Sequence, residues 1–145
     1  MELKIKKIRD NAIVPCRATE GSAGMDLHAC ITEPVTLKPF ERAIIPTGIS
    51  TALPNNEYAI FIFARSGLGI KHGIALSNGV GVIDSDYRGE ICVGLQNSGN
   101  ESYTINPDDR IAQMVVMPVS IPIISVVDEL DETRRNTGGF GSTGK

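Results

Sequence analysis

The longest uninterrupted apolar run in this sequence is Tyr58-Ala-Ile-Phe-Ile-Phe-Ala64. Its side chains are apolar at both odd and even positions, which predicts a central strand with both faces covered. The run is much shorter than the roughly 18 to 20 apolar residues that a membrane-spanning helix needs. We therefore expect a buried sheet built around this segment.

The apolar segments on either side are also short, and they are rich in Ile and Val, which suit strands. Apolar and other residues alternate in Ile91-Cys-Val-Gly-Leu-Gln96, as in a strand. Gly, Pro, Asn or Asp interrupts the apolar segments at short intervals, which is typical of an all-β sandwich or barrel. One short helical turn is expected over 66–71. Further strands are expected over 3–8, 25–29, 42–45, 73–76, 90–96, 103–105, 111–117 and 121–127.

Composition sets limits on the class of protein. The chain has 145 residues, 41% of them hydrophobic, which fits one domain with a core. A net charge of −3 gives no reason to expect nucleic acid or a membrane as a partner. Cys16, Cys30 and Cys92 are odd in number and widely spaced, so we expect neither a disulfide framework nor a CxxC-type zinc site. A reducing compartment, the cytoplasm, is the simplest setting.

The C-terminal residues differ from the rest, and we divide the chain into a β domain over 1–134 and an arm over 135–145. The arm is rich in glycine, whose backbone amides can converge on an anion beside Arg135, while Phe140 can stack on a flat ring. A solvated tail without a ligand is the alternative. The stretch Gly139-Phe-Gly-Ser-Thr-Gly-Lys145 fits GxxxxGK but lacks the Ser or Thr and the helix that follow in a P-loop.

Two further segments carry arginine beside a strand. Ala64-Arg-Ser-Gly-Leu-Gly69 follows the buried run and brings a guanidinium, a hydroxyl and a permissive backbone to one rim, which suits an oxyanion. An ordinary strand-to-turn junction is the alternative. Asp109-Arg-Ile-Ala-Gln113 opens another strand, and an edge or turn pair explains its polar residues equally well. His28 and His72 have no paired nucleophile, so we expect surface or packing histidines.

The densest polar stretch is Asn78-Gly-Val-Gly-Val-Ile-Asp-Ser-Asp-Tyr-Arg-Gly89. Its apolar pair before Asp84 puts that carboxylate at the end of a strand, where it can act as a general base toward water, a role worth roughly 10²–10⁴-fold in rate. The alternative is a plain hairpin with an Asp-Ser-Asp turn. Asp84 and Asp86 are not expected to share a metal, because alternate residues of a strand face opposite sides.

Together, the arginine segments, the aspartate hairpin and the aromatic glycine-rich tail suggest a nucleotide as ligand. In their order they resemble the homotrimeric dUTPase family, which carries five motifs in a fixed sequence. The resemblance spans residues 23–144. The five motifs here are Ala23-Gly-Met-Asp-Leu-His-Ala29, Ala64-Arg-Ser-Gly-Leu-Gly69, Gly79-Val-Gly-Val-Ile-Asp-Ser-Asp-Tyr-Arg-Gly89, Asp109-Arg-Ile-Ala-Gln113 and Arg135-Asn-Thr-Gly-Gly-Phe-Gly-Ser-Thr-Gly144.

This resemblance implies a jelly-roll-like β-barrel or sandwich with a flexible glycine-rich C-terminal arm. It implies a homotrimer with three active sites, each built at subunit boundaries. The implied reaction is hydrolysis of dUTP to dUMP and pyrophosphate with Mg²⁺, which limits uracil incorporation into DNA and supplies dUMP for thymidylate synthesis. A related dCTP deaminase and a non-catalytic, dUTP-responsive binding protein are the alternatives.

The resemblance also implies roles for single residues. Asp84 would deprotonate the water that attacks the α-phosphorus, and Tyr87 would lie under the deoxyribose and exclude a 2′-hydroxyl. Asp26 and Arg110 would be structural supports, and Mg²⁺ would be held by phosphates and water with no direct protein ligand. Uracil would be read by Asn78 and the backbone of Val82 and Ile83 and stacked on by Phe140, and phosphates would be held by Arg65, Ser66, Gly67, Gln113, Arg135, Gly141 and Ser142.

The chain departs from the family pattern at three positions. Met25 stands where an aromatic residue is common, Gly69 where Ala is usual, and Asn136 where Gly is usual. Asparagine tolerates a left-handed backbone better than most residues, so we expect the turn in the arm to survive. None of the three removes a proposed catalytic group.

Overall fold

The computed structural model describes residues 1–139. Strands make up 36% of it, with one short helix. The all-β class is thus confirmed, and so is the helical turn expected after the buried run. The elements are β1 (Lys4–Lys7), β2 (Met25–His28), β3 (Val35–Leu37), β4 (Arg42–Pro46), β5 (Ile49–Ala52), β6 (Tyr58–Phe63), α1 (Ser66–His72), β7 (Ile74–Leu76), β8 (Gly81–Ile83), β9 (Cys92–Asn97), β10 (Tyr103–Ile105) and β11 (Arg110–Pro118).

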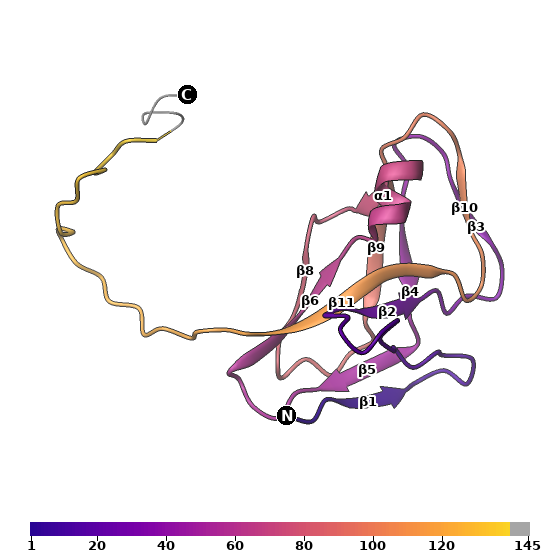
Figure 1. Cartoon of the computed structure of the whole chain (residues 1–145), viewed down its shortest axis with the longest axis horizontal. Coiled ribbons are helices and arrows are strands. Elements are labelled where there is room, and N and C mark those ends of the chain that lie inside the picture. The colour runs from indigo at the N-terminus through magenta and orange to yellow at the C-terminus, as the bar shows by residue number, and fades with distance from the viewer. Residues whose placement is uncertain (140–145) are drawn as a thin grey trace.

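The apolar run forms β6, an inner strand of the largest sheet. The strand order in that sheet is β2-β11-β6-β8, so β6 has a neighbour on each side (Figure 1). Both neighbours are antiparallel to it. Ile60 and Ile62 on one face of β6 are buried, whereas Phe61 and Phe63 on the other face are only partly buried. The expected cover is therefore complete on one face of the strand.

Three smaller sheets complete the body, with orders β4-β9-β7, β1-β5 and β10-β3. One hydrophobic core joins them to the main sheet, because it draws Leu27 from β2, Ile60 from β6 and Val93 from β9. No closed barrel is found among residues 1–139. Of the two arrangements expected, the sheets therefore adopt the one in which separate sheets share a core.

Three strands fall outside the expected ranges, β3, β5 and β8, although a strand that ends before Asp84 was expected for β8. The sequence of β5 is Ile-Ser-Thr-Ala, in which polar side chains hide the strand signal. Nevertheless Ser50 and Thr51 are buried, because β5 pairs with β1 at the side of the core. The local pattern is therefore misleading where a strand's polar side chains face inward.

After β11 the chain leaves the body and runs away from it as an extended segment (Figure 1). The strand expected over 121–127 is wrong, since that stretch has no strand. Ile123 is 97% exposed and Val126 is 95% exposed. The β-branched residues there favour a strand, but a strand forms only where another edge accepts its hydrogen bonds.

Candidate functional site

A concave pocket of about 380 Å³ lies where the main sheet meets the start of α1. The pairing register explains its composition, because Gln113 of β11 sits opposite Asp26 of β2 on one side and Phe63 of β6 on the other. Segments far apart in the sequence therefore meet at one edge. The pocket brings together six of the predicted site residues, Asp26, Arg65, Ser66, Gly67, Arg110 and Gln113.

The Asp26 carboxylate lies between two arginines. Its Oδ1 accepts a hydrogen bond from Arg65 Nε at 3.0 Å, and its Oδ2 accepts one from Arg110 Nη1 at 3.2 Å. Arg65 Nη1 also donates to the carbonyl of Arg110 at 3.3 Å. Hydrogen bonds between charged groups are strong and directional, so Asp26 fixes the orientation of both guanidinium groups.

The pocket carries more positive than negative charge. Two guanidinium groups face one carboxylate, and Arg110 remains 53% exposed while Asp26 is 17% exposed. Beside them lie the Ser66 hydroxyl and Gly67, around whose α-carbon there is open space. An anion with several oxygens fits this combination, since arginine offers a planar set of donors.

Gln113 is held in place from the adjoining loop. Its Nε2 donates to the carbonyl of Ala64 at 3.1 Å, directly before Arg65. A Cβ on Gly24 would come within 2.5 Å of Gln113 Oε1. Gly24 therefore leaves room for the Gln113 side chain at the pocket rim. The sequence motif contains this glycine, but only the pairing of β2 with β11 shows what it packs against.

His28 lies next to this cluster, at the irregular pairing where β2 meets Arg110. Its Nδ1 is buried and has no hydrogen-bond partner. Burial lowers the pKa of His28 below its usual 6.5, against the opposing effect of the Asp26 carboxylate. The ring is thus a neutral packing group, in agreement with the packing role expected for it.

The Asp84 hairpin lies elsewhere on the main sheet. β8 is the last strand in the sheet order, so within the described residues one of its edges pairs with no strand. Asp84 follows β8 directly and is exposed, and the amide of Tyr87 donates to its carbonyl at 3.2 Å to close a turn. Asn78 lies before β8, exposed, with its Nδ2 near Gly81.

Tyr87 packs against the backbone of its own hairpin. Its hydroxyl donates to the carbonyl of Glu90 at 3.1 Å, and the side chain is partly exposed. A Cβ on Gly89 would overlap the tyrosine hydroxyl. The ring thus lies across Gly89, and only glycine leaves room for it there.

The pocket and the Asp84 turn lie at opposite ends of β6. Ile83 pairs with Ile60, so Asp84 comes next to Ala59 at the start of β6, whereas Arg65 follows its end. An extended chain rises about 3.3 Å per residue, so residues 59 to 65 span about 20 Å. Within one chain the predicted base and the predicted phosphate ligands are therefore not brought together.

The described part of the arm ends in a compact turn. Arg135 Nε donates to the carbonyl of Gly138 at 2.8 Å, and Asn136 Oδ1 accepts from the amide of Thr133 at 3.0 Å. Asn136 has φ of +42°, the left-handed conformation expected for this position. Phe140, Gly141 and Ser142 lie outside the described residues.

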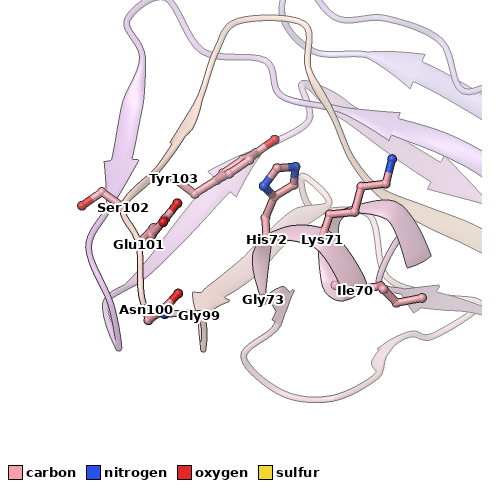
Figure 2. Close-up of a pocket in the computed structure, with 10 residues that line it drawn as sticks. Ile70, Lys71, His72, Gly73, Gly99, Asn100, Glu101, Ser102 and Tyr103 are labelled. Carbon is pink, nitrogen blue, oxygen red and sulfur yellow. The ribbon is translucent and has the colours of Figure 1, made fainter.

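A second cavity, of about 310 Å³, lies at the far end of α1, between the helix and the turn that joins β9 to β10. Figure 2 shows the rings of His72 and Tyr103 side by side at its wall, with ring centroids 4.9 Å apart. None of the predicted site residues lines it. It combines Lys71 and Glu101, so it lacks the excess of positive charge that marks the pocket at Arg65.

Residues 1–139 lack both a metal-ligating cluster and a membrane-spanning helix. They contain no cluster of three or more His, Cys, Asp or Glu side chains arranged to hold a metal ion. No helix in this part of the chain is long and apolar enough to cross a membrane.

The sequence is similar to a known protein family over nearly its whole length. The dUTPase family model matches residues 10–144. The deoxyuridine 5′-triphosphate nucleotidohydrolase of Hahella chejuensis is 51% identical over 139 residues, which cover 96% of this chain and 91% of that protein. The protein of the same name from Paraburkholderia xenovorans is 48% identical over 145 residues, 100% of this chain and 98% of its own.

Solved structures of dUTPases have a similar fold. The dUTPase of Staphylococcus bacteriophage 80alpha, in complex with dUpNHpp, superposes with a TM-score of 0.88 at 28% identity and covers 99% of both chains. A variant dUTPase from phage phi11 of S. aureus, which coordinates a structural Mg(II) ion, has a TM-score of 0.80 at 25% identity over 91% of this chain. The jelly-roll β fold expected from the resemblance is thereby confirmed.

Proposed function

This chain belongs to the dUTPase family, and from that premise we propose that it hydrolyses dUTP to dUMP and pyrophosphate. The observation that carries the proposal is that the chain has both an arginine-rich anion pocket around Asp26 and an exposed Asp84 at the end of β8. The first suits a triphosphate, and the second suits activation of water.

In this proposal Asp84 is the general base. Its carboxylate takes a proton from water, the water oxygen bonds to the α-phosphorus, and the bond from that phosphorus to the bridging oxygen breaks, so that pyrophosphate leaves with the bonding electrons. The exposed position of Asp84 at the turn leaves it free to face a ligand. Because the protein does little covalent chemistry in such a reaction, positioning and charge stabilisation supply most of the acceleration.

In this proposal the phosphates are bound by the anion pocket and by the arm. Arg65, Ser66, Gly67 and Gln113 are grouped there, with Asp26 and Arg110 as supports that hold the guanidinium groups in place. Arginine donors placed where charge accumulates stabilise the transition state. From the arm, Arg135, Gly141 and Ser142 would engage the outer phosphates.

Base and sugar would be read by the hairpin. The unpaired edge of β8, with Val82 and Ile83, offers backbone donors and acceptors to the uracil edge, next to Asn78. Tyr87 would lie against the deoxyribose, where its ring leaves no space for a 2′-hydroxyl. Phe140 of the arm would stack on the exposed face of the base.

A separation of about 20 Å between Asp84 and Arg65 supports an active site that is shared between chains, because one chain alone does not bring the two residues together. If one chain supplies the hairpin and another the anion pocket, the two halves meet at a subunit boundary. A homotrimer closes such head-to-tail contacts into a ring with three equal sites. The extended segment between β11 and the arm then has a neighbour to cover, which accounts for apolar residues such as Ile123 that its own body does not bury.

Mg²⁺ is proposed to arrive on the triphosphate. In this proposal phosphate oxygens and water hold the cation. When bound, Mg²⁺ offsets the negative charge of the phosphates. In the cytoplasm such an enzyme would limit uracil incorporation into DNA and supply dUMP for thymidylate synthesis.

The decisive experiment incubates the protein with each dNTP and Mg²⁺ and measures pyrophosphate and ammonia. We expect pyrophosphate from dUTP and very little from dTTP; equal activity on both would contradict the proposal, and ammonia from dCTP would indicate a deaminase. Asp84→Asn should retain dUTP binding and lose about 10²-fold or more in turnover. Unchanged turnover would remove Asp84 as the base.

A further inference from the structure

The Asp84 hairpin is joined to the body by the pairing of β8 with β6 on one side, and by the side chain of Glu90 on the other. Glu90 Oε2 accepts a hydrogen bond from Arg9 Nη2 at 2.9 Å, and Oε1 accepts one from the amide of Gly48 at 2.9 Å. Glu90 is mostly buried, with 19% of its side chain exposed. The N-terminal segment and the β4–β5 turn therefore hold the residue at which the hairpin ends.

The same residue holds Tyr87. The tyrosine hydroxyl donates to the Glu90 carbonyl at 3.1 Å, and the ring lies across Gly89. The other hydrogen bonds described for residues 84–90 stay within that segment, namely those of Arg88 to nearby carbonyls and the turn from Asp84 to Tyr87. Glu90 is thus the residue of this stretch whose side chain binds the body, and the amide of the next residue, Ile91, donates to the carbonyl of Ile49 at 2.9 Å.

The anchor on the body side is rigid. Gly48 has φ of +70°, and a Cβ there would come within 2.6 Å of Cys30 Sγ and 2.7 Å of the Ala12 side chain. No larger residue fits, so the amide that Glu90 accepts from is fixed by close packing on the core. Arg9 supplies the second contact from outside, on a side chain 46% exposed.

We propose that the Arg9–Glu90 pair is a positioning device that sets the Tyr87 ring and thereby the rejection of nucleotides with a 2′-hydroxyl. The inference rests on the proposed function, because it takes Tyr87 to face the sugar. Neither Arg9 nor Glu90 touches the substrate in this account. They act through the Glu90 backbone, whose carbonyl shifts when the side chain loses the Arg9 donor and keeps only the amide of Gly48.

The test compares kcat/KM for dUTP with kcat/KM for UTP. In Arg9→Met the long apolar stem remains and the charged donors are lost. We expect the dUTP-to-UTP ratio to fall about two- to fivefold, the size expected for an ion pair whose arginine is half exposed. Lys38→Met is the matched control, since it removes the same charge from an exposed side chain away from the hairpin. Arg9→Lys should restore part of the ratio.

A merely structural role would not move this ratio, because a smaller folded fraction lowers both rates equally. Tyr87→Phe provides an independent check, since it removes the hydroxyl that binds the Glu90 carbonyl. If Arg9 acts through Tyr87, Arg9→Met lowers the ratio much less in the Tyr87→Phe background than in the wild type. Additive effects of the two substitutions would overturn the inference.

The two proposals fail differently. A wild-type protein that hydrolyses dUTP no better than dTTP fails the proposed function. A wild type that prefers dUTP over UTP, together with an Arg9→Met variant that keeps the same ratio, overturns the positioning role alone.

Discussion

Gly24 and Gln113 are packed so closely that a Cβ on Gly24 would come within 2.5 Å of the Gln113 amide oxygen. The same amide group donates to the carbonyl of Ala64, directly before Arg65. The space at Gly24 therefore lets the Gln113 amide reach the carbonyl of Ala64, next to Arg65 of the anion pocket.

Gly24→Ala should displace Gln113 and weaken the pocket. The obstructing atom is the end of a flexible side chain, so the Gln113 amide can swing aside at little cost in stability. We expect the KM for dUTP to rise more than kcat falls, because a phosphate ligand is misplaced. Gly21→Ala is the control, since no atom lies within 4 Å of a Cβ at that position. Denaturant unfolding and steady-state kinetics on both variants check the prediction; equal behaviour of the two would contradict it.

Stability should depend on pH through His28. Well above pH 6.5 the ring is neutral in both the folded and the unfolded chain and contributes no pH dependence. Burial lowers the pKa of His28 in the folded protein. As the pH falls below 6.5, the unfolded chain therefore takes up the proton first, and the free energy of unfolding decreases.

We expect His28→Leu to reduce this slope between pH 7 and pH 5.5, because leucine neither titrates nor leaves a buried nitrogen without a partner. The measurement is denaturant unfolding of both proteins at each pH. A variant whose stability falls with pH as steeply as that of the wild type would assign the slope to other groups.

The sequence predicts most of the scaffold because its apolar run and its two-residue alternation are local. It also predicts the conformation of Asn136, since the preference of asparagine for a left-handed backbone is local as well. The stretch 121–127 was predicted wrongly, because strand propensity does not show whether a partner edge is present.

The contacts that shape the site are not local, and this is why the sequence left them out. Gly24 meets Gln113 only through the register of β2 against β11. Glu90 meets Arg9 and Gly48 across separate parts of the chain. The motifs name the residues at the site, whereas the pairing of strands determines which of them touch.

Removing 135–145 should abolish activity and spare the fold. The hydrogen bonds described for Arg135 and Asn136 stay within residues 133–138, so their loss takes nothing from the core. We expect an unchanged melting temperature and a loss of about 10²-fold or more in turnover, comparable to removal of a transition-state donor. Asn136→Gly is the control, since glycine adopts the same left-handed backbone. Full activity of the truncated chain would contradict a role for the arm in the site.

Mixing two inactive variants tests whether the site is shared between chains. Asp84→Asn removes the base and Arg65→Gln removes a phosphate ligand, and about 20 Å of β6 separates the two positions in one chain. In a shared site, the hairpin comes from one chain and the pocket from its neighbour. Some sites of a mixed oligomer then receive both intact halves.

After joint unfolding and refolding at equal amounts, each half is intact with a probability of one half. About one quarter of the sites are then complete, so about one quarter of wild-type activity should return. Each variant refolded alone is the control and should stay inactive, and wild type carried through the same steps gives the reference. If both halves instead came from a single chain, no complete site could form and the mixture would stay as inactive as its components, because every chain carries one defect.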